Sequence, residues 1–159
     1  ATQLFFLFQR MQQIQDLKQR SLFENVRVAD FLIEKDRLFA AVTLSAEEMI
    51  LYEKVYEHIT LDAPTPDLVI YLQAPIEILK ERITKRGNIN EQYLTLDYLE
   101  RLNDAYSRFF LNYNDAPLLI INASDINLES NEADYESLIS MIMSNPKGKN
   151  FVNPQPSII

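Results

Sequence analysis

Two short apolar runs constrain the fold of this chain more than any other feature of its sequence. One reads Asp67-Leu-Val-Ile-Tyr-Leu72 and the other reads Pro117-Leu-Leu-Ile-Ile-Asn122. Each run is continuous rather than alternating and is bounded by turn-forming residues, which is typical of a strand covered on both faces. Helical patterns separate the runs, so the sequence predicts an α/β fold with a parallel sheet.

Capping signals and turn residues place the other elements. We expect helices over residues 2–19, 45–59, 75–87, 95–112 and 133–143, a buried strand over Val26–Phe31, and an irregular tail from Asn145. The first turns, Leu4 to Phe8, are apolar all round and are therefore expected to be buried. Three strands are few for such a sheet, where about five to six are usual. Because the chain begins inside a helical pattern, we expect a further segment upstream of Ala1, whose absence would expose apolar surface.

The composition excludes several functions. The chain has only two glycines, Gly87 and Gly148, so it encodes neither the G-x-x-x-x-G-K-[ST] phosphate loop nor a dinucleotide fingerprint. With no cysteine and one histidine, His58, it has no disulfide scaffold, cysteine nucleophile or multi-histidine metal site. A net charge of -8 argues against nucleic acid polymers and anionic membranes as partners, and no apolar run is long enough to span a bilayer.

The first candidate site lies at the carboxyl end of the predicted strand Val26–Phe31. Ligands in open α/β sheets bind beyond the carboxyl ends of the strands, and Asp30 stands there, followed by Lys35 and Asp36. A carboxylate in this position could hold Mg²⁺, which favours one or two carboxylates together with substrate phosphates. A solvated charged turn explains the same residues.

The second candidate site is the cationic segment that contains Arg82, Lys85 and Arg86 and leads into Gly87. Arg82 and Arg86 are one helical turn apart and share a helix face. Such a face can close over phosphates and neutralise charge that develops in a transition state. Cations at a helix C-terminus are also favourable without any ligand, and the residues alone leave both interpretations open.

The third candidate site combines Gln3 and Arg10, which point the same way from the first predicted helix. A buried guanidinium needs a partner and a buried amide needs hydrogen bonds, and Asp36 is the natural counter-charge. Glutamine offers both a donor and an acceptor, as reading the edge of a nucleobase requires. A satisfied pair in the core is the alternative.

These three sites, in this order, resemble the deoxyribonucleoside kinases, P-loop enzymes that transfer the γ-phosphoryl group of ATP to the 5′-hydroxyl of a deoxynucleoside. The similar segments are Thr2–Leu7 with Arg10, Asp30–Ala40, Pro66–Ala74, and Arg82–Gly87 leading to Glu91 and Asp97–Glu100. The bacterial deoxyguanosine/deoxyadenosine kinase branch is the most similar. The resemblance implies a P-loop kinase-like three-layer fold that lacks its N-terminal strand-loop-helix. Residues 1–144 would be the C-terminal part of one domain and residues 145–159 an irregular tail.

The resemblance also implies how the substrate is read. Gln3 would hydrogen-bond the base, and Arg10 with Asp36 would read the polar edge of the base. Asp30 matches an acidic residue that acts near magnesium and the phosphates. The two residues after Asp30 depart from the arginine and serine that are common in the family, and we expect Lys35 to supply the missing positive charge.

At the phosphate end, Arg82 and Arg86 match the lid arginines of the family and, with Asp30, would be the catalytic residues of this chain. Lys85 would compensate for a further lid arginine that this sequence lacks. Glu91 matches the residue that holds the 3′-hydroxyl of the deoxyribose.

The resemblance places the phosphate loop and the general base upstream of Ala1. We therefore expect the parent protein to be a purine-preferring kinase that uses ATP and magnesium, and this chain alone to be inactive. A cytoplasmic homodimer in nucleotide salvage is expected. Two alternatives stay open. One is a thymidylate or other monophosphate kinase, although Arg10 and Asp36 suit a base with amino and carbonyl groups better than thymine. The other is a non-catalytic remnant kept for dimerisation.

Overall fold

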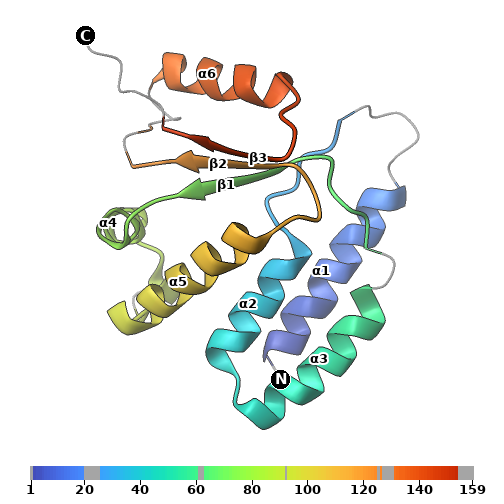
Figure 1. The fold of residues 1–159 in the computed structure, drawn as a ribbon. Helices are drawn as coiled ribbons and strands as arrows, with labels where there is room; N and C mark the ends of the chain where they lie inside the picture. Colours follow the sequence, from blue (N-terminus) through green and yellow to red (C-terminus); the bar gives the residue numbers. More distant parts are fainter. Residues whose placement is uncertain are drawn as a thin grey trace. The chain divides into compact units, whose positions relative to one another are not determined.

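The computed structural model describes residues 2–19, 26–60, 63–91, 93–124, 126 and 131–153 (Figure 1). The chain divides into two compact units, Ala1–Pro64 and Thr65–Ile159. The described part of the first contains helices without a sheet, and we call it the helical unit. The second contains a parallel sheet with its helices, and we call it the sheet unit. No helix among the described residues has the length and apolar character needed to cross a membrane.

Three helices form the helical unit: α1 (Thr2–Gln19), α2 (Ile33–Thr43) and α3 (Ala46–Thr60). They enclose a buried cluster made by Leu7, Ile14, Ile33, Ala40 and Tyr52. The predicted capping box opens α3: the Ser45 N–H donates to Glu48 Oε2 at 2.9 Å, and the Glu48 N–H donates to Ser45 Oγ at 3.3 Å. The predicted bounds of α1 are confirmed, and those of α3 are confirmed to within one residue.

The strand predicted over Val26–Phe31 is wrong. Residues 26–29 have no regular secondary structure, and Val26 and Val28 are 78% and 90% exposed. β-Branched residues favour a strand only where a neighbouring strand supplies hydrogen bonds and side-chain packing. The described sheet contains no strand from this segment. Helix α2 begins two residues after this segment and was not predicted, although the acidic residues Glu34 and Asp36 in its first turn favour a helix N-terminus.

The first turns of α1 also differ from the prediction. Leu7 is fully buried, but Phe5, Phe6 and Phe8 are 58%, 46% and 54% exposed. A helix that packs against two neighbours contacts them along one stripe only, and here that stripe passes through Leu7 and Ile14. The predicted burial of all sides of this end is therefore wrong.

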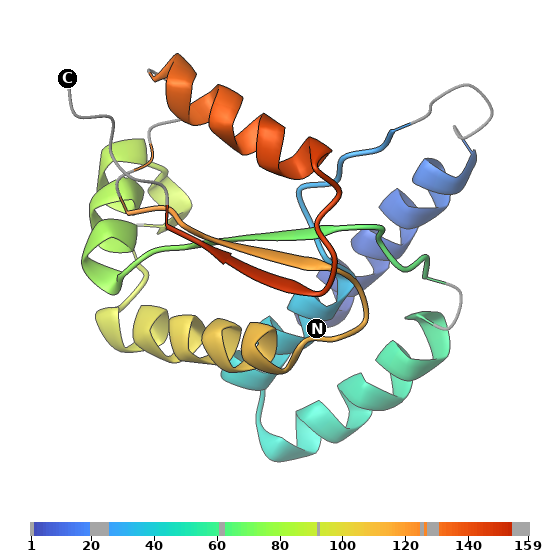
Figure 2. The ribbon, with the colours of Figure 1, turned by 45° about the horizontal axis from the view of Figure 1, so that its top comes forward.

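Three parallel strands in the order β1-β2-β3 form the sheet unit, and their register aligns the first residue of each. The strands are β1 (Val69–Gln73), β2 (Leu118–Asn122) and β3 (Lys149–Val152), and the helices are α4 (Ile76–Arg86), α5 (Leu96–Asn112) and α6 (Glu132–Met143). Helix α5 covers one face of the sheet and α6 the other (Figure 2). The predicted parallel α/β fold is confirmed, with α4, α5 and α6 within one residue of their expected bounds.

Strand β1 is packed on one face and open on the other. Tyr71 stacks on Phe110 of α5 with ring centroids 4.2 Å apart. Ile70 and Leu72, which point to the opposite face, are 39% and 47% exposed, and β1 lies at the edge of the sheet. Apolar exposure at a sheet edge was expected, and β1 has it.

The prediction of an irregular tail is wrong for Lys149–Val152, which form β3. Gly148 precedes this strand with a φ of +64°, and its carbonyl accepts a hydrogen bond from the Leu118 N–H at 2.8 Å. The four residues of β3 carry a weak strand signal, and pairing with β2 supplies what the local pattern lacks. The last part of the predicted tail, residues 154–159, lies outside the described residues.

Candidate functional site

Helix α4 follows β1 at the carboxyl edge of the sheet and ends in a cluster of cations. Lys85 and Arg86 form its last turn, where the helix dipole favours positive charge. The helix ends at Gly87, whose φ is +64° and whose N–H donates to two carbonyls of the last turn. The predicted glycine C-cap is confirmed. Two of the predicted lid cations therefore lie where the chain leaves α4.

Arg86 and Glu91 are in direct contact. A short 3₁₀ turn, Ile89–Glu91, brings the carboxylate back toward the helix end. Arg86 Nη2 lies 2.8 Å from Glu91 Oε2, and Arg86 Nε donates to the same oxygen at 3.1 Å. The arginine side chain is 63% exposed and the glutamate side chain 23% exposed. The structure thus pairs a predicted phosphate ligand with the predicted sugar ligand.

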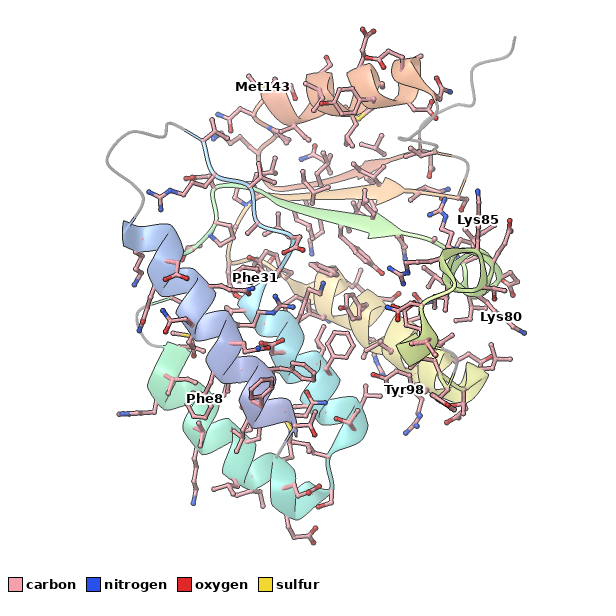
Figure 3. All side chains as sticks on the ribbon, turned by 180° about the vertical axis from the view of Figure 1, so that it is seen from behind. Phe8, Phe31, Lys80, Lys85, Tyr98 and Met143 are labelled. Carbon is pink, nitrogen blue, oxygen red and sulfur yellow. The ribbon has the colours of Figure 1, made fainter. Side chains whose placement is uncertain are left out.

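Arg82 lies one turn earlier on α4 and contacts backbone instead. Its Nη2 donates to the carbonyl oxygen of Ala123 at 2.6 Å and more weakly to that of Ile126 at 3.5 Å. Lys85 is exposed, as Arg82 is, and its side chain extends from α4 as that of Lys80 does (Figure 3). The three predicted lid cations are therefore in three different environments.

In the helical unit, Arg10 and Asp36 come together as expected. Arg10 Nε lies 3.9 Å from Asp36 Oδ1, and Arg10 Nη1 donates to Gln13 Oε1 at 2.9 Å. The guanidinium carbon lies 5.0 Å from the centroid of the Phe31 ring. Cation, carboxylate and aromatic ring thus form one cluster between α1 and α2.

Asp36 is the more enclosed partner, with a side chain 12% exposed against 36% for Arg10. Burial raises the pKa of its carboxyl group, and the nearby charges of Arg10 and Lys35 oppose that effect. Asp36 Oδ2 is buried and has no hydrogen-bond partner among the described residues. Asp36 Oδ2 is therefore an unsatisfied acceptor in the described part of the helical unit.

Gln3 is anchored within the same unit. Its Nε2 donates to Thr43 Oγ1 at 3.1 Å, and the Thr43 hydroxyl donates to the Phe39 carbonyl oxygen at 2.7 Å. This chain of hydrogen bonds holds the glutamine side chain of α1 against α2. Among the described residues, Gln3 and Arg10 each have partners within the helical unit, and no hydrogen bond joins the two side chains. The satisfied pair in the core therefore stays open as an alternative to a base-reading role.

Asp30 is exposed and lies three residues before Ile33, the first residue of α2. The described residues contain no group of three or more His, Cys, Asp or Glu side chains that could hold a metal ion. The pKa of the Lys35 amine is lowered, mainly by burial and further by the positive charge of Arg10. The negative charges of Asp30 and Asp36 oppose this lowering. Asp30 and Asp36 therefore both act on Lys35.

Tyr52 of α3 was not predicted from the sequence to be a buried residue. It is 1% exposed, and its hydroxyl has no hydrogen-bond partner among the described residues. Burial raises the pKa of the phenol, and the negative charge of Asp36 raises it further. Its ring stacks on Tyr56 with centroids 5.9 Å apart. The one-turn spacing of the two tyrosines was the signal that could have placed Tyr52 on the buried face of its helix.

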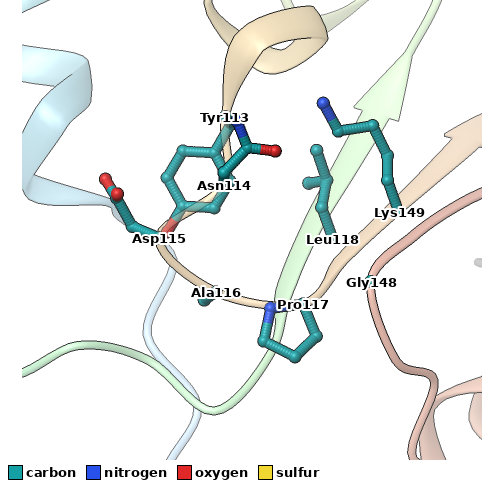
Figure 4. A pocket seen from close by; sticks show the side chains of 8 residues that line it. All are labelled: Tyr113, Asn114, Asp115, Ala116, Pro117, Leu118, Gly148 and Lys149. Atoms are coloured by element: carbon teal, nitrogen blue, oxygen red, sulfur yellow. The ribbon is translucent and has the colours of Figure 1, made fainter.

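A cavity of about 300 Å³ lies at the other end of the strands (Figure 4). It is lined by Tyr113, Asn114, Asp115, Ala116, Pro117, Leu118, Gly148 and Lys149. These residues precede or begin β2 and β3, so the cavity lies at the amino ends of the strands. Because ligands in open α/β sheets bind beyond the carboxyl ends, this cavity is not the candidate site.

Comparison with known proteins assigns the family. The family model described as deoxynucleoside kinase matches residues 1–145. The chain belongs to the deoxynucleoside kinase family. The deoxyguanosine kinase of Bacillus subtilis is 30% identical over 145 residues, covering 88% of this chain and 70% of the relative. The deoxyadenosine/deoxycytidine kinase of the same organism is 27% identical over 152 residues, covering 89% and 68%.

A solved structure supports the same assignment. The deoxyadenosine kinase from M. mycoides with bound dATP has a TM-score of 0.73 and 26% identity, covering 89% of this chain and 72% of that structure. The resemblance to the family, the α/β kinase fold and the class of enzyme are thereby confirmed. Membership also favours a deoxynucleoside kinase over the monophosphate kinase that was considered beside it.

Proposed function

We propose that this chain carries the base-reading and lid residues of an enzyme that transfers the γ-phosphoryl group of ATP to the 5′-hydroxyl of a purine deoxynucleoside. One observation carries the proposal: Arg10 and Asp36 lie side by side, and Asp36 keeps a buried oxygen without a partner among the described residues. A guanidinium donates and a carboxylate accepts, so the pair complements a base edge that has both acceptors and donors. The names of the relatives, deoxyguanosine and deoxyadenosine kinases, support a purine.

Phe31 and Gln3 would complete the base site. The Phe31 ring already lies against the Arg10 guanidinium, and an aromatic face can also stack on a base. Gln3 lies on the same helix as Arg10. Its amide nitrogen donates a hydrogen bond to Thr43, and this bond orients the Gln3 side-chain amide. In this proposal the Gln3 carbonyl oxygen accepts a hydrogen bond from the base.

Arg86 and Lys85 would bind the phosphates, and Glu91 would bind the 3′-hydroxyl. Arg86 and Glu91 hold each other at 2.8 Å in this structure, so substrate binding would exchange their mutual contact for contacts with the phosphate and the sugar. A guanidinium that neutralises the charge on the transferred group is the usual device of phosphoryl-transfer enzymes. The transfer yields a deoxynucleoside monophosphate and ADP.

Asp30 would hold magnesium. A single exposed carboxylate fits Mg²⁺, which proteins bind through one or two carboxylates together with substrate phosphates. The ion would neutralise charge on the phosphates. The negative charge of Asp30 acts on the amine of Lys35, and this amine would add positive charge on the same side of α2.

The phosphate cradle is the part that this sequence does not encode. With two glycines the chain cannot form a Walker-type loop, so we propose that the 159-residue chain alone does not transfer phosphate. The two units would belong to one kinase domain of a cytoplasmic homodimer in nucleotide salvage. The exposed phenylalanines of α1 offer an apolar surface for the second copy.

A binding panel with the purified chain tests this function. Deoxyguanosine and deoxyadenosine should bind more tightly than thymidine or any deoxynucleoside monophosphate. Arg10→Ala should weaken nucleoside binding about 10- to 100-fold, because hydrogen bonds to charged groups contribute about 1.5–3 kcal/mol. Arg108→Ala, at an exposed position of α5, is the matched control and should leave binding unchanged.

Two outcomes would contradict the proposal. Preference for a monophosphate would favour the monophosphate kinase alternative. Turnover of deoxyguanosine or deoxyadenosine with ATP and magnesium by this chain would refute the claim that it is inactive alone.

A further inference from the structure

Arg82 occupies a different position from the other cations of α4. Arg86, one turn later, ends beside the carboxylate of Glu91, whereas Arg82 reaches the backbone that follows β2. Its Nη2 lies 2.6 Å from the Ala123 carbonyl oxygen, a short charge-assisted hydrogen bond, and 3.5 Å from that of Ile126. One side chain of α4 therefore holds two points of the segment between β2 and α6.

The Ala123 carbonyl needs such a donor. Ala123 is 5% exposed, and its own N–H donates to the Gln73 carbonyl oxygen at 2.7 Å, which extends the hydrogen bonding of β1 and β2 by one residue. Asn122 is the last residue that pairs with β1. Beyond the end of the ladder, no strand of the described residues pairs with this part-buried carbonyl, and Arg82 supplies the hydrogen bond.

A separate device sets the local shape of this segment. Asn122 Oδ1 accepts from the Ser124 N–H at 3.0 Å and from the Ser124 hydroxyl at 2.7 Å, which makes an Asx turn directly after β2. The turn shapes the backbone but does not attach it to α4. Only Arg82, among the hydrogen bonds of the described residues, joins the side chains of α4 to this segment.

The resemblance to the family implied a phosphate contact for Arg82, and the geometry points to another role. We propose that Arg82 is a positioning residue that fixes the segment after β2 to α4, leaving Arg86 and Lys85 as the phosphate-binding cations. To bind a phosphate through Nη2, Arg82 would have to release the part-buried Ala123 carbonyl. The consequence for phosphate binding rests on the proposed function, whereas the attachment of the backbone does not.

Amide hydrogen exchange on the full chain, read by NMR, tests the attachment. In Arg82→Ala the Ala123 and Ser124 amides should exchange about tenfold faster, as expected when one hydrogen bond to a charged group is lost. Lys80→Ala, at an exposed position of the same helix, should leave both rates unchanged. Arg82→Lys keeps the positive charge but replaces the planar guanidinium with a single ammonium group, and should give exchange rates between those of the wild type and Arg82→Ala. Unchanged exchange in both Arg82 variants would overturn the proposal.

Titration with inorganic tripolyphosphate at low and high ionic strength separates positioning from direct contact. Loss of a cation that touches the anion weakens binding more at low salt, where its charge is less screened. Arg86→Ala should show this dependence, while Arg82→Lys should weaken binding by the same factor at both salt levels. If Arg82→Lys binds like the wild type while Arg82→Ala shows the salt dependence of Arg86→Ala, Arg82 is a phosphate ligand and the proposal is wrong. If the wild type binds no tripolyphosphate, the proposed function fails at this site while the exchange rates still decide the attachment.

Discussion

Removing the ring of Phe110 should destabilise the sheet unit more than any surface change on the same helix. The side chain is 3% exposed, and it stacks on Tyr71 of β1 at 4.2 Å between centroids. It also meets Phe109 edge-on at 5.0 Å. Through these contacts Phe110 fastens α5 to β1, the strand that leads into α4.

The magnitude follows from burial and ring contacts. Burial of a Phe side chain contributes about 1.5–3 kcal/mol, and the cavity left by alanine brings the usual cost of Phe→Ala to about 3–5 kcal/mol. Leu111, the next residue, is 66% exposed, so Leu111→Ala should cost about 0.5 kcal/mol or less. Phe110→Leu keeps most of the volume and should cost about 1.5 kcal/mol at most.

Urea unfolding followed by far-UV circular dichroism measures these differences. For a slope of about 2 kcal/mol per molar urea, a loss of 4 kcal/mol lowers the midpoint by about 2 M. Should Phe110→Ala not fold, Phe110→Leu still has to unfold at lower urea than Leu111→Ala. Equal midpoints for the Phe110 and Leu111 variants would refute the packing argument.

Two further predictions concern α4 and the helical unit. Gly87→Ala should lower the free energy of unfolding by about 1 kcal/mol in the same urea assay. Gly87 has a φ of +64° and nothing lies within 4 Å of an added Cβ, so the cost is that of the left-handed backbone conformation alone. An unchanged urea midpoint would contradict this. Burial raises the pKa of Asp36 above 3.8, so the folded protein binds the proton of the Asp36 carboxyl group more tightly than the unfolded chain does. The stabilisation of the fold by this proton is complete at low pH and is lost as the pH rises through the pKa of the folded state. The free energy of unfolding of the wild type should therefore fall relative to that of Asp36→Asn as pH increases from about 4, and a parallel pH dependence of the two proteins would show that the pKa is not raised.

Local signals predicted most of the helices and the strands β1 and β2. The capping box at Ser45 and the glycine after α4 act within one helical turn, so their effect is already present in the sequence. Strands depend on partner strands far along the chain, which explains the two errors in strand prediction, the strand expected over Val26–Phe31 and the unexpected β3. The β-branched residues Val26 and Val28 have no partner strand in the described sheet, and Lys149–Val152 gain one in β2 despite a weak pattern.

The candidate site was predictable in its charges but not in its pairing. The contact between Arg10 and Asp36 followed from the requirement that an enclosed cation have a counter-charge. The contact between Arg86 and Glu91 depends on the path of the short turn that joins them, and local sequence does not determine that path. The backbone contacts of Arg82 were missed for a related reason, because carbonyl groups at the end of a strand carry no sequence signature.

In the proposed function, Asp36 and Arg10 read the base of a deoxynucleoside. Calorimetric titration of deoxyguanosine into the wild type, Asp36→Asn and Asp104→Asn tests it most directly, since Asp104 is an exposed acid on α5. We expect at least about tenfold weaker binding for Asp36→Asn, because the amide replaces one acceptor of a charged hydrogen-bonding pair, and unchanged binding for Asp104→Asn. Equal affinity of the wild type and Asp36→Asn for deoxyguanosine would contradict it.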